Sequence, residues 1–166
     1  MPAPRVFSGK RLRDAGVSAV GFTGGCQCAA VRYTIAAESL VAYACHCREC
    51  QKQSASAFGV SVPVLESALS IEGETASWGR PTDSGSWTDC HFCPRCGTRL
   101  FHDGRGRPGV LTIKGGSLDE PGQLEFVAHI WTSRKQPWID LPERLVQWET
   151  QPSTQAEWLQ MLSGAQ

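Results

Sequence analysis

The sequence predicts a domain that is mostly β. Apolar and polar residues alternate in short stretches such as Val31–Ile35 and Phe58–Val64, and this period of two is typical of strands with one buried face. Turns rich in Gly and Pro separate the stretches, and no repeat of fixed length occurs. A chain of 166 residues is long enough to bury a core. We therefore expect an all-β or mostly β architecture.

This domain is expected to run from residue 21 to residue 166 as a single unit. Residues 1–20 contain two Pro and two Gly that break any regular period, so we expect an irregular lead-in there. A basic arm that grips a partner is the alternative interpretation of the same residues.

Between these strands the sequence predicts irregular connections. Residues 51–57 are small and polar, which predicts a turn of helix or a loop. Residues 72–86 are rich in Gly, Ser, Thr and Pro and predict a long surface connection. Trp78 and Trp87 interrupt this connection and either pin it to the core or line a pocket. The remaining strands are expected at residues 40–44, 69–71, 100–102, 110–114 and 124–131.

One helix is predicted near the C-terminus. Thr154 and Glu157 have the spacing of a capping box. The apolar residues that follow form a stripe at helical spacing, and Gly164 is expected to stop the helix.

The densest cluster of the eight cysteines is Cys45–Cys50, with the sequence CHCREC. In an extended backbone Cys45 and Cys47 point to the same face. Cys47 and Cys50 have the spacing of a tight turn that brings a third sulfur to the same point. Three thiolates without a fourth ligand in the segment predict a zinc ion that keeps one coordination position open.

A second group of cysteines has the spacing of a closed zinc site. Cys93 and Cys96 flank a Pro-Arg pair, and Gly97 lets the backbone curl as in a zinc knuckle. Cys26 and Cys28 supply a further pair of sulfurs before a predicted strand. The four thiolates together predict a structural zinc site, which would contribute on the order of 10 kcal/mol to folding.

Charge and hydropathy narrow the class of protein. Lys plus Arg and Asp plus Glu both number 16, so the formal net charge is zero, which argues against a nucleic-acid partner. No run of 18 apolar residues occurs, so no membrane span is expected. The N-terminal residues lack the apolar segment of a secretory signal. Free thiols then predict a reducing compartment, the cytoplasm, and not disulfides.

Several single residues near the clusters allow two interpretations. His46 lies between two predicted ligands; packing or a hydrogen bond beside the site is expected, and ligation or proton transfer is the alternative. Cys90 is a spare buried thiol, a fourth ligand that closes the three-thiolate site, or a redox-active neighbour. His91, His102 and His129 are expected to be ordinary strand residues.

Aromatic and basic residues could complete a binding site. Trp131 and Trp138 are expected to lie in the core or in a pocket wall. Four basic residues close to the clusters in sequence would pair with substrate carboxylates, or are solvated surface charges: Arg48, Lys52, Arg95 and Arg99.

The order of the motifs carries a family resemblance. The motifs are Gly25-Cys26-x-Cys28, Cys45-His46-Cys47-x-x-Cys50, Phe92-Cys93-x-x-Cys96-Gly97, His129-Ile130-Trp131 and Pro137-Trp138-Ile139. In this order they resemble the glutathione-dependent formaldehyde-activating enzyme family, which also includes centromere protein V. The resemblance covers roughly residues 21–145. It implies a Mss4-like fold of packed antiparallel sheets with short helices, and zinc sites at strand ends and in loops.

The resemblance also implies the two ligand sets. Cys26, Cys28, Cys93 and Cys96 would hold the structural zinc, and Cys45, Cys47 and Cys50 would hold the zinc at which chemistry occurs. Cys90 lies outside the seven cysteines of the family pattern. We expect the three-thiolate ion to be lost more readily than the four-thiolate ion.

Two functions follow from these expectations. The first is a zinc-dependent carbon–sulfur lyase of the S-hydroxymethylglutathione synthase type, which acts on the adduct of an aldehyde with glutathione or another small-molecule thiol. The alternative is a non-catalytic, zinc-stabilised binding module, as the centromere relative illustrates.

Overall fold

The computed structural model describes residues 21–163, which fall into two compact units. The described part of the first unit is residues 21–38 and 63–123, and that of the second is residues 39–62 and 124–163. The predicted lead-in over residues 1–20 and the predicted helix stop at Gly164 lie outside the described residues. The single domain over residues 21–166 stays a prediction.

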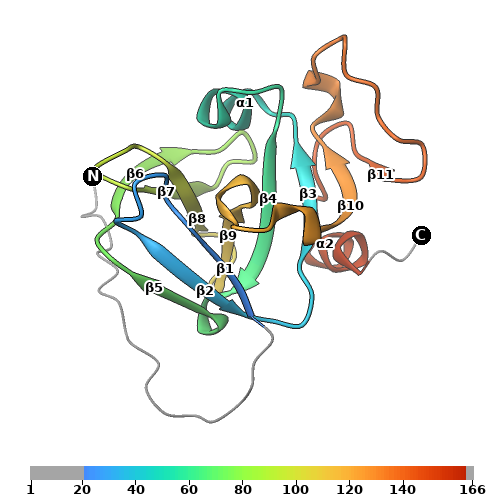
Figure 1. The fold of residues 1–166 in the computed structure, drawn as a ribbon. Coiled ribbons are helices and arrows are strands. Elements are labelled where there is room, and N and C mark those ends of the chain that lie inside the picture. The colour runs from blue at the N-terminus through green and yellow to red at the C-terminus, as the bar shows by residue number, and fades with distance from the viewer. Residues whose placement is uncertain (1–20, 164–166) are drawn as a thin grey trace. The chain divides into compact units, whose positions relative to one another are not determined.

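The prediction of a mostly β fold is confirmed, because residues 21–163 form eleven strands and two short α-helices. The first unit contains a three-stranded antiparallel sheet in the order β1-β2-β5 and an antiparallel run in the order β9-β8-β7-β6 (Figure 1). Its strands are β1 (Gly21–Gly25), β2 (Arg32–Ala36), β5 (Leu69–Glu72), β6 (Ala76–Pro81), β7 (Trp87–Phe92), β8 (Arg99–Gly104) and β9 (Val110–Lys114).

The connection predicted over residues 72–86 is wrong in part, because strand β6 lies within it. Ser and Gly have low intrinsic strand propensity, and antiparallel pairing with β7 overrides it. Trp78 is 53% exposed and therefore does not pin this segment to the core. Trp87 is half-buried and begins β7.

The second unit contains the strand order β11-β10-β3-β4. β3 and β4 are antiparallel as predicted, whereas β10 pairs in parallel with both β3 and β11, which departs from an antiparallel sheet. The elements are β3 (Val41–Cys45), α1 (Arg48–Ser54), β4 (Gly59–Leu65, of which residues 59–62 belong to this unit), β10 (Glu125–Ile130), β11 (Val146–Gln147) and α2 (Gln155–Leu162).

Helix α2 forms where the capping box predicts it. Thr154 Oγ1 accepts from the backbone N–H of Glu157 at 3.2 Å, and Glu157 Oε2 accepts from the backbone N–H of Thr154 at 3.0 Å. The helix lies beside β10 (Figure 1). It buries Met161 in an apolar cluster that also contains the side chains of Tyr43 and Cys45. The second unit therefore has a core that reaches one of the cysteine clusters.

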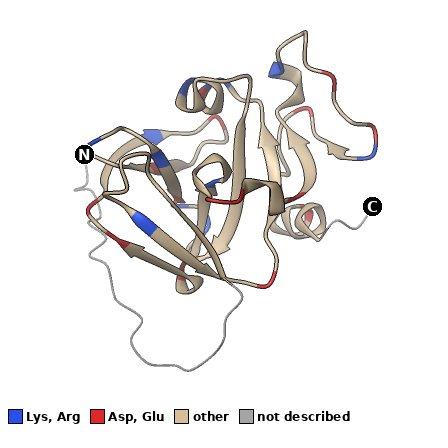
Figure 2. Cartoon of the chain, in the orientation of Figure 1, with Lys and Arg blue, Asp and Glu red and all other residues tan. Residues whose placement is uncertain are grey.

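Charged residues of both signs are interspersed in each unit (Figure 2), in agreement with a formal net charge of zero. None of the helices in residues 21–163 is long and apolar enough to cross a membrane.

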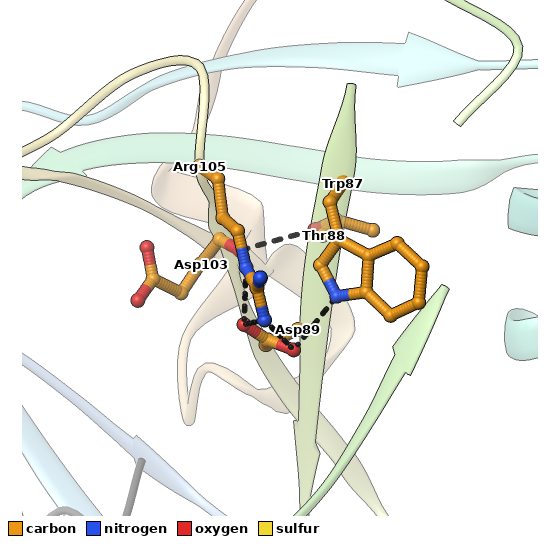
Figure 3. A network of polar contacts seen from close by, with 5 residues as sticks. All are labelled: Trp87, Thr88, Asp89, Asp103 and Arg105. Atoms are coloured by element: carbon orange, nitrogen blue, oxygen red, sulfur yellow. Dashed lines mark hydrogen bonds and ion pairs between the residues drawn. The ribbon is translucent and has the colours of Figure 1, made fainter. Parts of the chain in front are cut away.

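A polar network fixes strand β7 against β8 and the turn that follows it (Figure 3). The Asp89 carboxylate accepts from Trp87 Nε1 at 3.2 Å and from Arg105 Nη2 at 3.2 Å. The Thr88 hydroxyl donates to the carbonyl of Asp103 at 3.3 Å. Because Trp87 and Arg105 both hold Asp89, its carboxylate cannot move aside without breaking hydrogen bonds.

Replacement of Gly79 tests this network. A Cβ atom there would lie 2.6 Å from Asp89 Oδ1 and 2.7 Å from Trp87 Nε1. We expect Gly79→Ala to lower the free energy of unfolding by about 1–3 kcal/mol, as overpacking does elsewhere, measured by urea denaturation. Gly104→Ala is the matched control, because no atom lies within 4 Å of its added Cβ. Equal stability of the two variants would contradict the role given to the network.

Candidate metal centres

Four cysteines of the first unit bring their sulfurs together. Cys26 and Cys28 follow β1, Cys93 and Cys96 follow β7, and their four Sγ atoms all lie within 4.8 Å of one another. The Cys26–Cys28 and Cys28–Cys93 Sγ distances are 3.6 and 3.7 Å. Tetrahedral coordination with Zn–S bonds of about 2.3 Å requires sulfur separations of about 3.8 Å. The arrangement could therefore hold a metal ion and is consistent with zinc.

The backbone forms a tight turn at each of these pairs. Gly97 has φ = 75°, which favours glycine, and its N–H donates to the carbonyl of Cys93 at 2.9 Å. The N–H of Val31 donates to Cys26 Sγ at 3.2 Å. Hydrogen bonding to Thr98 lowers the pKa of Cys96 to about 5. These contacts favour the thiolate form that a metal ligand needs.

Three cysteines of the second unit form the other group, which we call the three-thiol loop (residues 45–50). Cys45 ends β3, Cys47 caps the N-terminus of α1, and Cys50 lies in the first turn of α1. Their Sγ atoms all lie within 4.8 Å of one another. Cys45 and Cys50 are buried, whereas Cys47 is partly exposed. This group could also hold a metal ion, with its accessible side at Cys47.

Ionisation of Cys45 in the three-thiol loop is opposed by its neighbours. Proximity to Cys47 and Cys50, together with burial, raises the pKa of Cys45 well above its usual value. None of the eight cysteines forms a disulfide, as predicted. A divalent cation would compensate the repulsion between three thiolates, so the donor chemistry fits zinc.

His46 is fully buried and hydrogen-bonded to His129, with 3.0 Å between His46 Nε2 and His129 Nδ1. Burial, and then the neighbouring His129, lowers the pKa of His46 to about 4, and burial also lowers the pKa of His129. Both rings are therefore neutral near pH 7. The ring nitrogens of His46 do not belong to the group of ligand atoms formed by the three sulfurs. This geometry agrees with the expected packing beside the site and not with ligation.

Gln51 directly follows Cys50 and connects the three-thiol loop to the segment after β10. Its Nε2 donates to the carbonyl of His46 at 2.6 Å and to that of Arg134 at 2.9 Å. Its Oε1 accepts from Arg48 Nη1 at 3.0 Å and from Gln136 Nε2 at 2.7 Å. The contact between Gln51 and Gln136 could not be predicted from the sequence, because no local pattern marks a contact between residues 85 positions apart.

The other predicted basic residues are dispersed. Lys52 makes an exposed ion pair with Glu49 at 3.3 Å, and Arg95 is exposed. The guanidinium of Arg99 lies over the Phe92 ring, 5.0 Å from its centroid. Of the four, Arg48 lies within the three-thiol loop, and its Nη1 donates to Gln51 Oε1.

The remaining residues that the sequence singled out lie mostly in strands. His91 and His102 lie in β7 and β8 and His129 lies in β10, as expected. Cys90 is buried in β7 and belongs to neither group of sulfurs, which agrees with a spare buried thiol. Trp131 packs partly buried against the core of the second unit, whereas Trp138 is 71% exposed and is not a core residue.

Comparison with known proteins places these clusters in a family context. The family model described as glutathione-dependent formaldehyde-activating enzyme matches residues 21–134, which is more than half of the chain and includes all seven clustered cysteines. A similar solved structure is the crystal structure of a Rhodobacter sphaeroides protein. It is 19% identical in sequence, the match covers 63% of this chain and 99% of that chain, and the TM-score is 0.48.

The buried His46–His129 contact is expected to contribute to the free energy of unfolding. His129→Leu removes one partner and leaves His46 Nε2 buried without it, so we expect a loss of about 1–3 kcal/mol in the free energy of unfolding. The double variant His46→Leu/His129→Leu should lose less than the sum of the two single variants, because no polar nitrogen is then left unsatisfied. Urea denaturation of the four proteins measures this, and additive losses would contradict a stabilising hydrogen bond.

The two groups have four and three cysteine ligands, and we therefore expect a chelator to remove their metal ions in sequence. With zinc bound, titration with a chelator should remove about one zinc per chain before the protein loses its folded circular dichroism signal, because three thiolates hold an ion less tightly than four. Cysteine protection from alkylation, mapped by mass spectrometry, should be lost first at Cys45, Cys47 and Cys50. Earlier loss of protection at Cys26 and Cys93 would reverse the assignment.

Proposed function

The chain belongs to the glutathione-dependent formaldehyde-activating enzyme family, and from this premise we propose that it is a carbon–sulfur lyase. Its substrate is the adduct of glutathione, or another small thiol, with an aldehyde, and S-hydroxymethylglutathione is the simplest example. The observation that carries the proposal is the three-thiol loop, which gathers three sulfurs, one of them from the partly exposed Cys47.

The two cysteine groups have different roles in this proposal. Cys26, Cys28, Cys93 and Cys96 would hold a zinc ion with all four positions filled by protein, which stabilises the fold. The three cysteines of the three-thiol loop would hold a second zinc ion. Such an ion, when bound, supplies a position for a substrate sulfur and favours its thiolate form.

The reaction needs no oxidant or reductant. In the direction of cleavage the C–S bond of the hydroxymethyl thioether breaks and its electron pair goes to sulfur. The hydroxyl group loses its proton as the C=O bond forms, and sulfur takes up a proton, so that the products are the thiol and formaldehyde. In the direction of synthesis the same bond forms by attack of the thiolate on the aldehyde carbon.

Contacts of the three-thiol loop with other residues support this chemistry because they fix the shape of the loop. The hydrogen bond to His129 and the bond from Gln51 hold His46, which lies between Cys45 and Cys47. Neutral His46 and His129 add no positive charge that would compete with a metal for the thiolates. The loop is therefore preorganised by contacts that do not involve sulfur.

A pair of cysteine variants tests the proposal. We expect Cys47→Ser to lower lyase activity on S-hydroxymethylglutathione by at least about 100-fold while the protein stays folded, because loss of a ligand costs more than loss of a residue that only supports one. Cys96→Ser should abolish cooperative unfolding, since it removes a ligand of the structural zinc. Formaldehyde release and circular dichroism are the measurements. Wild-type protein that contains about two zinc ions per chain and is inactive on thiol–aldehyde adducts would contradict the lyase and favour the binding module.

A further inference from the structure

The Gln51 side chain uses all of its hydrogen-bonding capacity. A side-chain amide offers two N–H donors and two acceptor lone pairs. Gln51 donates to the carbonyls of His46 and Arg134 and accepts from the side chains of Arg48 and Gln136. A glutamine whose four positions are all occupied has one orientation, because a flipped amide would set its donors against Arg48 and Gln136 and its oxygen against two carbonyls.

These bonds join two parts of the chain that are more than 80 residues apart. One part is the three-thiol loop. The other part is the segment Trp131–Gln136, which follows β10 and begins at Trp131 in the left-handed region, with φ = 58° and ψ = 38°. This conformation is uncommon for a bulky aromatic residue and persists only where surrounding contacts impose it. Here the N–H of Thr132 donates to the carbonyl of Trp148 at 3.0 Å.

The segment that Gln51 holds carries a basic side chain on an aromatic ring that packs against the core of the three-thiol loop. The guanidinium of Arg134 lies over the Trp131 ring, 4.4 Å from its centroid. Trp131 and Cys47 pack against the same buried cluster, which contains Cys45 and Cys50. Arg48 is exposed on α1 and uses one of its five N–H donors on Gln51. Basic residues accordingly lie on both α1 and the 3₁₀ turn Thr132–Arg134 (Figure 2).

We propose that Gln51 is a positioning residue, which fixes the guanidinium of Arg48 so that it binds a carboxylate of an anionic thiol substrate beside the three sulfurs. This inference rests on the proposed function. Glutathione carries two carboxylates, and the Arg48 guanidinium, which donates one of its N–H groups to Gln51, keeps others with which to pair with a carboxylate. Gln136, which completes the contact, lies beyond the residues matched by the family model.

Titration calorimetry of the zinc-loaded protein tests the proposal with two probes. Glutathione carries both carboxylates, and glutathione diethyl ester keeps the thiol and removes the negative charges. We expect Gln51→Leu to weaken the binding of glutathione about tenfold, and Gln136→Leu, which removes one hydrogen bond, about threefold. Binding of the ester should change by less than about twofold in both variants. Gln53→Leu on the same helix is the control and should bind both probes as the wild type does.

The ratio of the affinities for glutathione and for its diethyl ester distinguishes a loss of positioning from damage to the metal site. Zinc content is measured on every variant, and if Gln51→Leu does not fold, Gln136→Leu decides the question. Equal weakening of glutathione and ester, or unchanged binding of both, would overturn the inference while leaving the lyase proposal intact. A wild-type protein that binds neither probe contradicts the proposed function and this inference with it.

Discussion

Repulsion between neighbouring thiolates is the constraint on which both sites depend. Four sulfurs in one unit and three in the other lie within 4.8 Å of their group members, and no disulfide relieves the crowding. In the three-thiol loop, the neighbouring sulfurs and burial raise the pKa of Cys45 and so oppose its ionisation. Such groups become stable as thiolates when a divalent cation compensates their charge. The arrangement of the sulfurs is therefore that expected of two metal sites.

The two groups differ in how the protein holds them. Around Cys26, Cys93 and Cys96 the sulfurs are held by tight turns, a left-handed Gly97 and hydrogen bonds from nearby donors to sulfur. Around the three-thiol loop, the His46–His129 pair and Gln51 add contacts to residues more than 80 positions away. Contacts that do not involve the sulfurs can keep the shape of a metal site while the ligand at its open position is replaced. This property suits catalysis.

The features of the fold and of the sites that could be predicted from the sequence are those set by residues a few positions apart. Both cysteine groups and helix α2 follow from spacing, because turn geometry and the Thr154–Glu157 capping box act within a few residues. Strand β6 could not be predicted, since pairing with β7 outweighs the low strand propensity of its Ser and Gly residues. The hydrogen bonds of His129 and Gln51 could not be predicted either, because their partners lie more than 80 residues away in the chain. The exposure of Trp138 depends on tertiary packing and leaves no mark on its neighbours in sequence.

X-ray absorption at the zinc edge tests the central claim most directly, because it counts the sulfur neighbours of the bound metal. If one ion has four cysteine ligands and the other has three, the zinc-loaded protein should show an average sulfur coordination between three and four. Addition of glutathione should raise this average to four as the substrate sulfur takes the open position. An average of four sulfurs that glutathione leaves unchanged would show that both sites are closed, and would contradict the division into a structural and a reactive centre.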